Sequence, residues 1–222
     1  MRIRVEGGQP LNGVYTPAGS SNAAIHLLAA ALMTDQPVTL HNVPNTANTQ
    51  AMVALARLLG ADASEASGIV TLHTPQIIRR ALTPDETQGF VGALLYLAPI
   101  LARRGYARLE LDFAPHRIRT HLDALRDLGQ DVQMIDGAIE LRAAKWDYQD
   151  ILLTQASVTA TTMVLLLAAA LGKETRIRNA ACEPQIQALG ELLELMGVEL
   201  QGIGSNVLHI WGQRPLLGAS VT

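Results

Sequence analysis

The sequence contains little cysteine and little charge. One cysteine, Cys182, stands among 222 residues, so no disulfide can form within the chain. Disulfides persist in oxidising compartments, and a chain without one fits a reducing compartment more easily. Charged residues make up 17% of the chain, below the usual share of about a quarter, while 49% are hydrophobic. We therefore expect a cytoplasmic protein with a large buried core.

Other absences exclude whole classes of function. Aromatic residues make up 4% of the chain and the net charge is −3, which argues against a surface for nucleic acid or membrane. The apolar runs are too short to span a bilayer, and the opening residues, MRIRVEGGQP, lack the apolar stretch of a secretion signal. The histidines show no ligand spacing with carboxylates, so neither a metal nor a cofactor is expected.

The sequence contains three copies of one repeated unit, in residues 37–73, 106–142 and 174–212. Each copy begins with an alternating strand that ends near a proline and continues into an amphipathic helix stopped by Gly60, Gly129 or Gly197. A glycine directly after the last helical turn is the usual C-terminal cap. Two further strands around a turn follow in each copy. Because the three glycines are almost equally spaced, the pattern predicts three copies of one supersecondary unit.

A second kind of helix precedes each copy, in the segments NAAIHLLAAALM, GFVGALLYLAPILA and VTATTMVLLLAAAL. These segments have almost no polar face, and a helix that is apolar all round belongs in the middle of a fold. The predicted fold class is therefore α/β, with three repeats about a pseudo-threefold axis, apolar helices at the centre and small sheets outside. Residues 14–212 are expected to form this one domain, residues 1–13 a lone edge strand, and residues 213–222 a truncated linker.

Two stretches, TPAGSSNAA before the first apolar helix and the later NAACEPQI, carry a resemblance to a known family. In the enolpyruvyl transferases the corresponding motifs read S-G-A-K-N-A-A and N-A-A-R-E-P-E-I, and the similarity covers essentially the whole chain. The resemblance implies an inside-out barrel domain of three βαβαββ units, with the active site between it and a second domain that pairs with residues 1–13. It also implies transfer of an enolpyruvyl group from phosphoenolpyruvate to a nucleotide sugar, UDP-N-acetylglucosamine, in peptidoglycan precursor synthesis.

The resemblance assigns substrate contacts to six positions: Ser21 and Asn22 in the first turn, His116 and Arg117 in the loop LDFAPHRIRTH, and Ser157 and Val158 in QASVTAT. Departures from the family are as informative. Ser21 replaces a lysine, Val91 replaces an arginine, and the loop has no cysteine. Gln155 and Thr159 replace a lysine and a glycine. The reaction needs cations for phosphate and carboxylate as well as an acid and a base. The resemblance implies that the general base and further arginines lie in the second domain, so no catalytic residue is predicted in this chain.

Structural alternatives stay open beside these assignments. Ser21 and Asn22 suit a helix cap, with or without a ligand. Cys182 is interpreted as a small buried residue and His26 as a satisfied core histidine. His116 and His121 are interpreted as solvated surface groups. The basic run HRIRTH is interpreted as a solvated helix entrance, although a helix start with two arginines also favours phosphate.

Three functions remain open. In the first, the chain is one half of an enolpyruvyl transferase and needs a second domain or a second chain. The second is a catalytically silent binding or interaction module on the same fold. The third is nucleic-acid end chemistry, because RNA 3′-terminal phosphate cyclases have a distantly similar repeat fold, but the net charge opposes it. An unpaired N-terminal strand and an uncovered face of the helix bundle also predict self-association.

Overall fold

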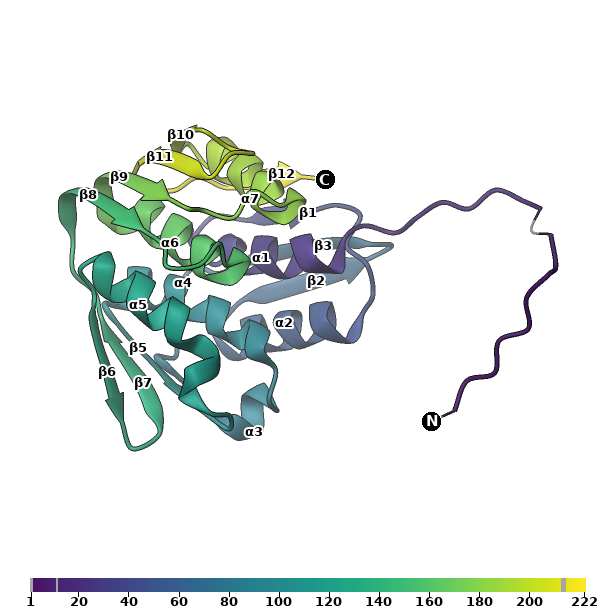
Figure 1. The fold of residues 1–222 in the computed structure, drawn as a ribbon, viewed down its shortest axis with the longest axis horizontal. Helices are drawn as coiled ribbons and strands as arrows, with labels where there is room; N and C mark the ends of the chain where they lie inside the picture. The colour runs from purple at the N-terminus through teal and green to yellow at the C-terminus, as the bar shows by residue number, and fades with distance from the viewer. Residues whose placement is uncertain (1, 11, 213–214) are drawn as a thin grey trace.

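The computed structural model describes residues 2–10, 12–212 and 215–222, and they form one body from which the N-terminal segment runs out (Figure 1). The first unit consists of α1 (Ser21–Ala31), β1 (Val38–Leu40), α2 (Ala47–Leu58), β2 (Asp62–Ala66) and β3 (Ile69–His73). The second consists of β4 (Ala81–Leu82), α3 (Pro84–Thr87), the 3-10 helix η1 (Val91–Tyr96), α4 (Leu97–Arg104), β5 (Tyr106–Glu110), the 3-10 helix η2 (Pro115–Ile118), α5 (Arg119–Asp127), β6 (Asp131–Ile135) and β7 (Ala138–Arg142). The third consists of β8 (Trp146–Leu152), α6 (Val158–Leu171), β9 (Gly172–Arg178), α7 (Pro184–Leu195), β10 (Glu199–Gln201) and β11 (Val207–Trp211), and β12 (Ala219–Val221) follows it.

The three sheets have the same strand order, and this confirms the predicted repeats. The orders are β4-β5-β7-β6, β8-β9-β11-β10 and β12-β1-β3-β2. In each sheet the first pair is parallel and the other two pairs are antiparallel. The first unit has no leading strand of its own, and β12 takes that place. The linker prediction for residues 213–222 is therefore wrong for Ala219–Val221, while residues 213–214 lie outside the described residues.

The glycine landmarks of the sequence are helix caps, as predicted. Gly60, Gly129 and Gly197 have φ values of 106°, 84° and 94°, a left-handed conformation that favours glycine. The N–H group after each glycine bonds back into the helix, as Ala61 does to the carbonyl of Ala56 at 2.9 Å. The same bond ends all three outer helices, so the chain turns from helix to hairpin in the same way in each unit.

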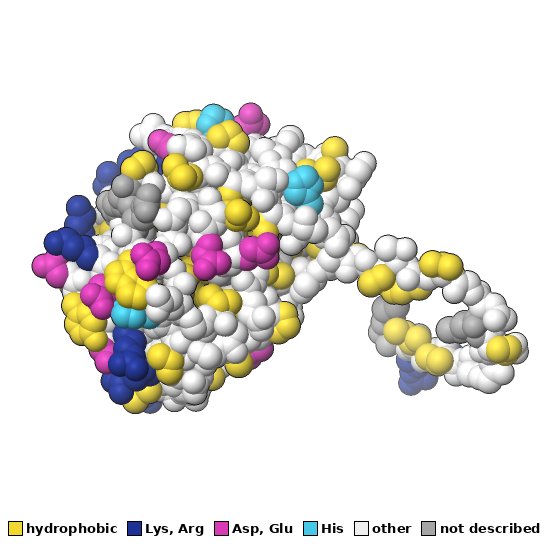
Figure 2. Space-filling view, turned by 90° about the horizontal axis from the view of Figure 1, so that it is seen from above, with side chains coloured by type: hydrophobic (Ala, Val, Ile, Leu, Met, Phe, Trp, Pro, Cys, Tyr) yellow, Lys and Arg dark blue, Asp and Glu magenta, His cyan; other side chains and the backbone are white. Residues whose placement is uncertain are grey.

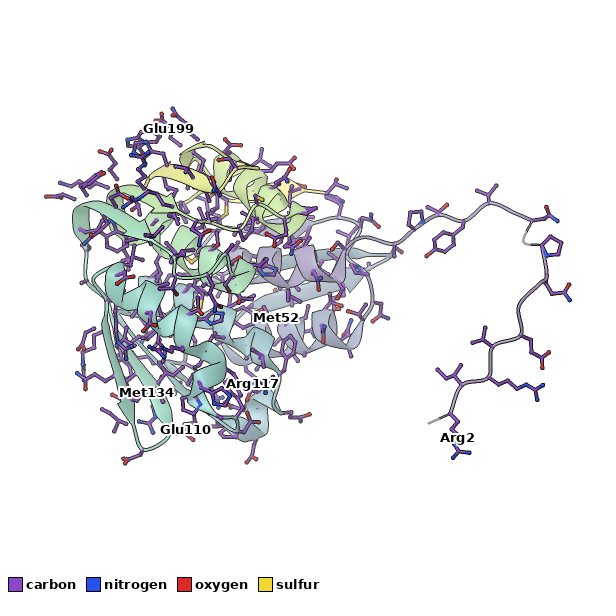
Figure 3. The ribbon with its side chains drawn as sticks, in the orientation of Figure 1. Arg2, Met52, Glu110, Arg117, Met134 and Glu199 are labelled. Carbon is purple, nitrogen blue, oxygen red and sulfur yellow. The ribbon has the colours of Figure 1, made fainter. Side chains whose placement is uncertain are left out.

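The apolar helices occupy the centre. Every residue of α6 from Ala160 to Leu171 is buried, and α6 packs on both α4 and α5 (Figure 1). The outer helices α2, α5 and α7 each bury one face and expose the other to solvent. At the centre, the fully buried Tyr96 donates its hydroxyl hydrogen bond to the carbonyl of Met52 at 2.8 Å, and Figure 3 places Met52 in the middle of the molecule. Burial raises the pKa of the Tyr96 phenol, so it stays neutral.

The N-terminal segment does not form the lone strand that the sequence suggested. Residues 2–10 have no helix or strand and lie away from the body (Figure 1). Ile3 and Val5 are 76% and 85% exposed. An alternating segment becomes a strand only when a neighbouring strand supplies its hydrogen bonds, and the described residues of the body supply none to it.

Arg103 holds the C-terminal end of α1, and its replacement is predicted to destabilise the fold. Its guanidinium donates to the carbonyls of Leu32, Thr34 and Pro75 at 3.1, 2.9 and 2.9 Å. The last carbonyls of a helix have no partner within the helix. Arg103→Ala should lower the free energy of unfolding by about 2 kcal/mol or more, measured by urea denaturation.

The control is Arg57→Ala, on an exposed ion pair with Glu65, which should cost less than about 1 kcal/mol. Arg103→Lys should not restore stability, because an ammonium lacks the planar fork that reaches three carbonyls. Wild-type stability in Arg103→Lys would show that the fork is not needed.

Candidate functional site

The starts of five helices gather on one face of the body. Ser21 at the start of α1 bonds to Thr46, the cap of α2, with 2.9 Å between the two hydroxyl oxygens. The Thr161 hydroxyl of α6 accepts from the backbone N–H of Ala181, just before α7, at 3.0 Å. The start of α5 bonds to the start of α6 through two side-chain pairs described below. Backbone N–H groups at helix starts have no helical acceptor, so this face presents donors to a ligand.

A cavity of about 270 Å³ lies between the starts of α1 and α7. Its wall includes Gly19, Asn42 and Pro184. A side chain at Gly19 would place its Cβ 1.9 Å from the carbonyl oxygen of Asn42, so only glycine allows the turn before α1 to approach this closely. Asn42 itself has a φ of 54°, a left-handed conformation that asparagine tolerates. The turn that resembled a substrate turn is thus fixed against the end of β1.

The structure corrects the capping interpretation of this turn. Ser20 is the cap of α1, and its side chain accepts from the N–H of Ala23 at 3.2 Å. The Ser21 hydroxyl points instead to α2, and the exposed Asn22 offers only its carbonyl, to Nδ1 of His26 at 2.5 Å. The Asn22 side chain is therefore free of the capping role and available at the surface of the face.

The predicted residues Ser157 and Val158 lie at the start of α6. Ser157 caps the helix by accepting from the N–H of Ala160 at 3.3 Å, and Val158 is the first helical residue. Next to them, Nε2 of His121 lies 2.5 Å from the Thr159 hydroxyl, and the Thr120 hydroxyl donates to the Gln155 side-chain oxygen at 3.3 Å. Two of the residues that depart from the family, Gln155 and Thr159, thus tie α6 to α5.

His121 is buried, so its interpretation as a surface group is wrong. Its side chain sits on the inner side of the amphipathic α5, where only the 3.6-residue register against α6 decides burial. Burial lowers the pKa of His121, whose Nδ1 has no hydrogen-bond partner in the described residues. Burial also lowers the pKa of His26, whose Nε2 has no partner in the described residues, so the expectation of a satisfied core histidine holds for one ring nitrogen only.

The other predicted residues lie apart from this group. His116 and Arg117 are exposed in η2, and the Arg117 guanidinium stands 5.6 Å from the centre of the Phe113 ring. Figure 3 shows Arg117 in the lower part of the body, well separated from α1. The structure therefore does not bring this arginine to Ser21 and Asn22. Val91, half-buried, opens η1 and adds no charge.

Cys182 is exposed, so the expectation of a buried cysteine is wrong. It lies in the segment between β9 and α7, where the chain leaves the sheet and burial depends on the path of the loop. Among the described residues, no three histidine, cysteine, aspartate or glutamate side chains group as metal ligands would. Within the same residues, no helix has the length and hydropathy needed to cross a bilayer.

Solved structures define the class of this fold. The enolpyruvyl transferase NikO from Streptomyces tendae superposes with a TM-score of 0.84 at 21% identity, over 97% of this chain and 52% of that chain. EPSP synthase from Acinetobacter baumannii superposes with a TM-score of 0.70 at 16% identity, over 94% of this chain and 48% of that chain. The fold is that of an enolpyruvyl transferase domain.

Sequence comparison then shows the family. The model of EPSP synthase (3-phosphoshikimate 1-carboxyvinyltransferase) matches residues 5–222, and the chain belongs to this family. It is 38% identical over 217 residues to UDP-N-acetylglucosamine 1-carboxyvinyltransferase of Bradyrhizobium diazoefficiens, covering 96% of this chain and 50% of the relative. The enzyme of the same name from Treponema pallidum is 37% identical over 224 residues, covering 99% and 52%. The chain thus spans about half the length of the curated relatives it matches.

Stability is predicted to fall below neutral pH because of His26 and His121. A histidine with a lowered pKa in the folded state binds its proton more readily when unfolded. The free energy of unfolding therefore reaches its full value above about pH 6.5, the pKa of histidine in the unfolded chain. It decreases as the pH falls below that value. Urea denaturation between about pH 8 and pH 5 measures this slope.

A His26→Leu, His121→Asn double variant should flatten the slope, whereas Ser64→Ala, which removes no titratable group, should leave it unchanged. An unchanged slope in the double variant would mean that other groups cause the pH dependence.

Proposed function

We propose that this chain supplies one half of the active site of an enolpyruvyl transferase that acts on a nucleotide sugar. The observation that supports the proposal is that Ser21 and Asn22 open α1 while Ser157 and Val158 open α6, because these four positions resemble substrate contacts and the two central helices contact each other. The relatives' printed name supports UDP-N-acetylglucosamine as the acceptor and a carboxyvinyl group as the group transferred. Phosphoenolpyruvate would be the donor, in the cytoplasm, within peptidoglycan precursor synthesis.

Transfer needs more than this half provides. A general base must take the proton of the acceptor hydroxyl, an acid must protonate the vinyl carbon, and fixed cations must stabilise phosphate and carboxylate. Ser21 and Val91 carry no charge. The remaining groups would come from a second domain or a second chain that covers the face. Binding of the acceptor by this half alone is the part of the function that its own residues support.

A second candidate is a catalytically silent binding module on the same fold. The observation that favours it is the replacement of potential cations by hydroxyl and amide side chains that bond to one another, as in Thr120 with Gln155. Turnover separates the two candidates, because a silent module binds the acceptor and gives no product with any second half.

Asn22→Ala is predicted to weaken binding of UDP-N-acetylglucosamine. Calorimetric titration should show micromolar to millimolar affinity for the wild type, about −8 to −4 kcal/mol. The loss of one hydrogen-bonding side chain at an exposed position should reduce it by about 1 kcal/mol, roughly fivefold. Phosphoenolpyruvate is then added to the complex.

Ser64→Ala, exposed on the outer sheet, is the matched control and should bind as the wild type does. Equal affinity in Asn22→Ala would remove Asn22 from the site, and no heat with either ligand would contradict the proposed function.

We also propose that the N-terminal segment and the helix-start face engage a second domain or a second chain. The exposed pair Ile3 and Val5 shares one side of an alternating segment. Light scattering at about 100 μM should show self-association, since apolar surface of this kind is rarely left uncovered. Ile3→Asp with Val5→Asp should reduce it, and Gln9→Asp serves as the control. A monodisperse wild-type monomer would contradict the proposal.

A further inference from the structure

The last strands of the three sheets, β2, β6 and β10, each have one edge without a neighbouring strand among the described residues. An unpaired edge presents main-chain N–H and C=O groups that can bind a strand of another chain. Proteins block such edges with charged residues, with short strands or with side chains that cover them. Because the three strands hold equivalent places in three repeats, each edge serves as a comparison for the other two.

Two of these edges are blocked. The guanidinium of Arg57 in α2 donates to the main-chain carbonyl of Ala63 at 3.1 Å and to the Glu65 carboxylate at 2.8 Å. The Gln50 side chain donates to the same carboxylate at 3.0 Å, so side chains cover the edge of β2. The third sheet ends in β10, which has only three residues, Glu199–Gln201, against five in β2 and five in β6.

β6 carries an apolar side chain where β2 carries the blocking carboxylate. Counted along the paired strands, Met134 of β6 stands at the position of Glu65 in β2, and Val132 stands at that of Ala63. Residues 132–135 contain no charged side chain. Met134 is 38% exposed, and Figure 3 shows it on the β6–β7 hairpin at the periphery of the body. Most of this edge is therefore uncharged and open to solvent.

The arginine that blocks β2 has a counterpart in α5 that points elsewhere. Arg57 and Arg126 both stand three residues before the glycine that ends their helix. Arg126 donates to Asp123 on its own helix at 3.2 Å. The N-terminal segment leaves the body at the end opposite to β6, as Figure 1 and Figure 2 show. Neither this arginine nor the N-terminal segment therefore covers the edge of β6.

The hairpin turn decides which main-chain groups of β6 are free. A two-residue turn with φ values of 50° and 77° joins β6 to β7, and Ile135 pairs with Ala138 across it. The residues that flank such a turn exchange both main-chain hydrogen bonds, and the bonded side alternates along an extended strand. The N–H and C=O groups of Val132 and Met134 therefore point away from β7, towards the open edge.

We propose that β6 pairs with β6 of a second copy, antiparallel about a twofold axis, so that the two sheets continue into one another. The register that overlaps both strands completely places Val132 opposite Met134 of the second copy and Gln133 opposite its own counterpart. Val132 and Met134 then exchange both main-chain hydrogen bonds with the second copy. Asp131 comes to lie opposite Ile135, so no like charges face each other across the pair.

A second copy suits this edge because one contact pairs both free edges at once and closes at two chains. Two strands of five residues make a smaller interface than a standard one, so the dissociation constant should be about 10 μM to 1 mM. The pairing depends neither on the ligand of the proposed function nor on the N-terminal segment.

Sedimentation of the full chain between about 10 μM and 1 mM should show a monomer–dimer equilibrium. Amide hydrogen exchange over the same range identifies the surface. Exchange at Val132 and Met134 should slow as the concentration rises, because their N–H groups gain acceptors only in the dimer. Exchange at Gln133 and Ile135, whose N–H groups point to β7, should change much less.

Met134→Pro removes one free N–H group and no bond to β7, and edge strands accept proline in this orientation. It should raise the dissociation constant by about tenfold or more, because each dimer loses two hydrogen bonds. Met134→Lys, which places a charge on the edge, should also weaken the dimer. Ile69→Lys is the matched control: Ile69 is 39% exposed, but β3 has a strand on each side. The control should stay within about twofold of the wild type.

A chain that stays monomeric at about 1 mM would overturn the inference. A dimer in which Val132 and Met134 exchange as fast as they do in the monomer would also overturn it. Ile3→Asp with Val5→Asp separates this contact from that of the N-terminal segment, since the dimer through β6 should persist in this variant. Loss of all association there, with no effect of Met134→Lys, would assign the contact to the N-terminal segment and not to β6.

Discussion

The rest of the structure depends on covering α6 and its two partners, α1 and α4, on every side. A helix with no polar face gains stability only when other elements exclude water from its whole circumference. One sheet covers one side of such a helix, so three helices in contact need three sheets around them. The three identical strand orders meet this requirement, and β12 closes the ring where the first unit has no leading strand.

This arrangement also places the candidate site. In a parallel strand–helix–strand unit the helix runs back against its strands, so each helix starts where the preceding strand ends. Three units around one axis then direct the starts of α1, α2, α5, α6 and α7 to one side. Because these helix starts lie side by side, hydrogen bonds join α1 to α2, α5 to α6 and α6 to α7. A face of N–H donors is therefore a consequence of the fold, and side chains determine what it binds.

In this chain, neutral side chains join the helix starts on that face, and Arg119 opens α5 beside them. Gln155, which replaces a lysine of the family, accepts a hydrogen bond from the Thr120 hydroxyl, and Thr159 pairs with His121. Such pairs hold neighbouring helices in register.

The sequence by itself determined the repeats, the apolar helices and their caps, because each depends on short-range pattern: a period of 3.6, a glycine such as Gly60 at a positive φ, an alternating strand. Tertiary structure decided the rest. Three adjacent residues, Ser20 to Asn22, all suit a helix cap, and contact with α2 selected Ser20. His121 was buried by its register against α6, and Cys182 was exposed by the path of a loop. Ala219–Val221 is too short to show a pattern, and it became a strand because the other end of the chain left a sheet edge open beside it.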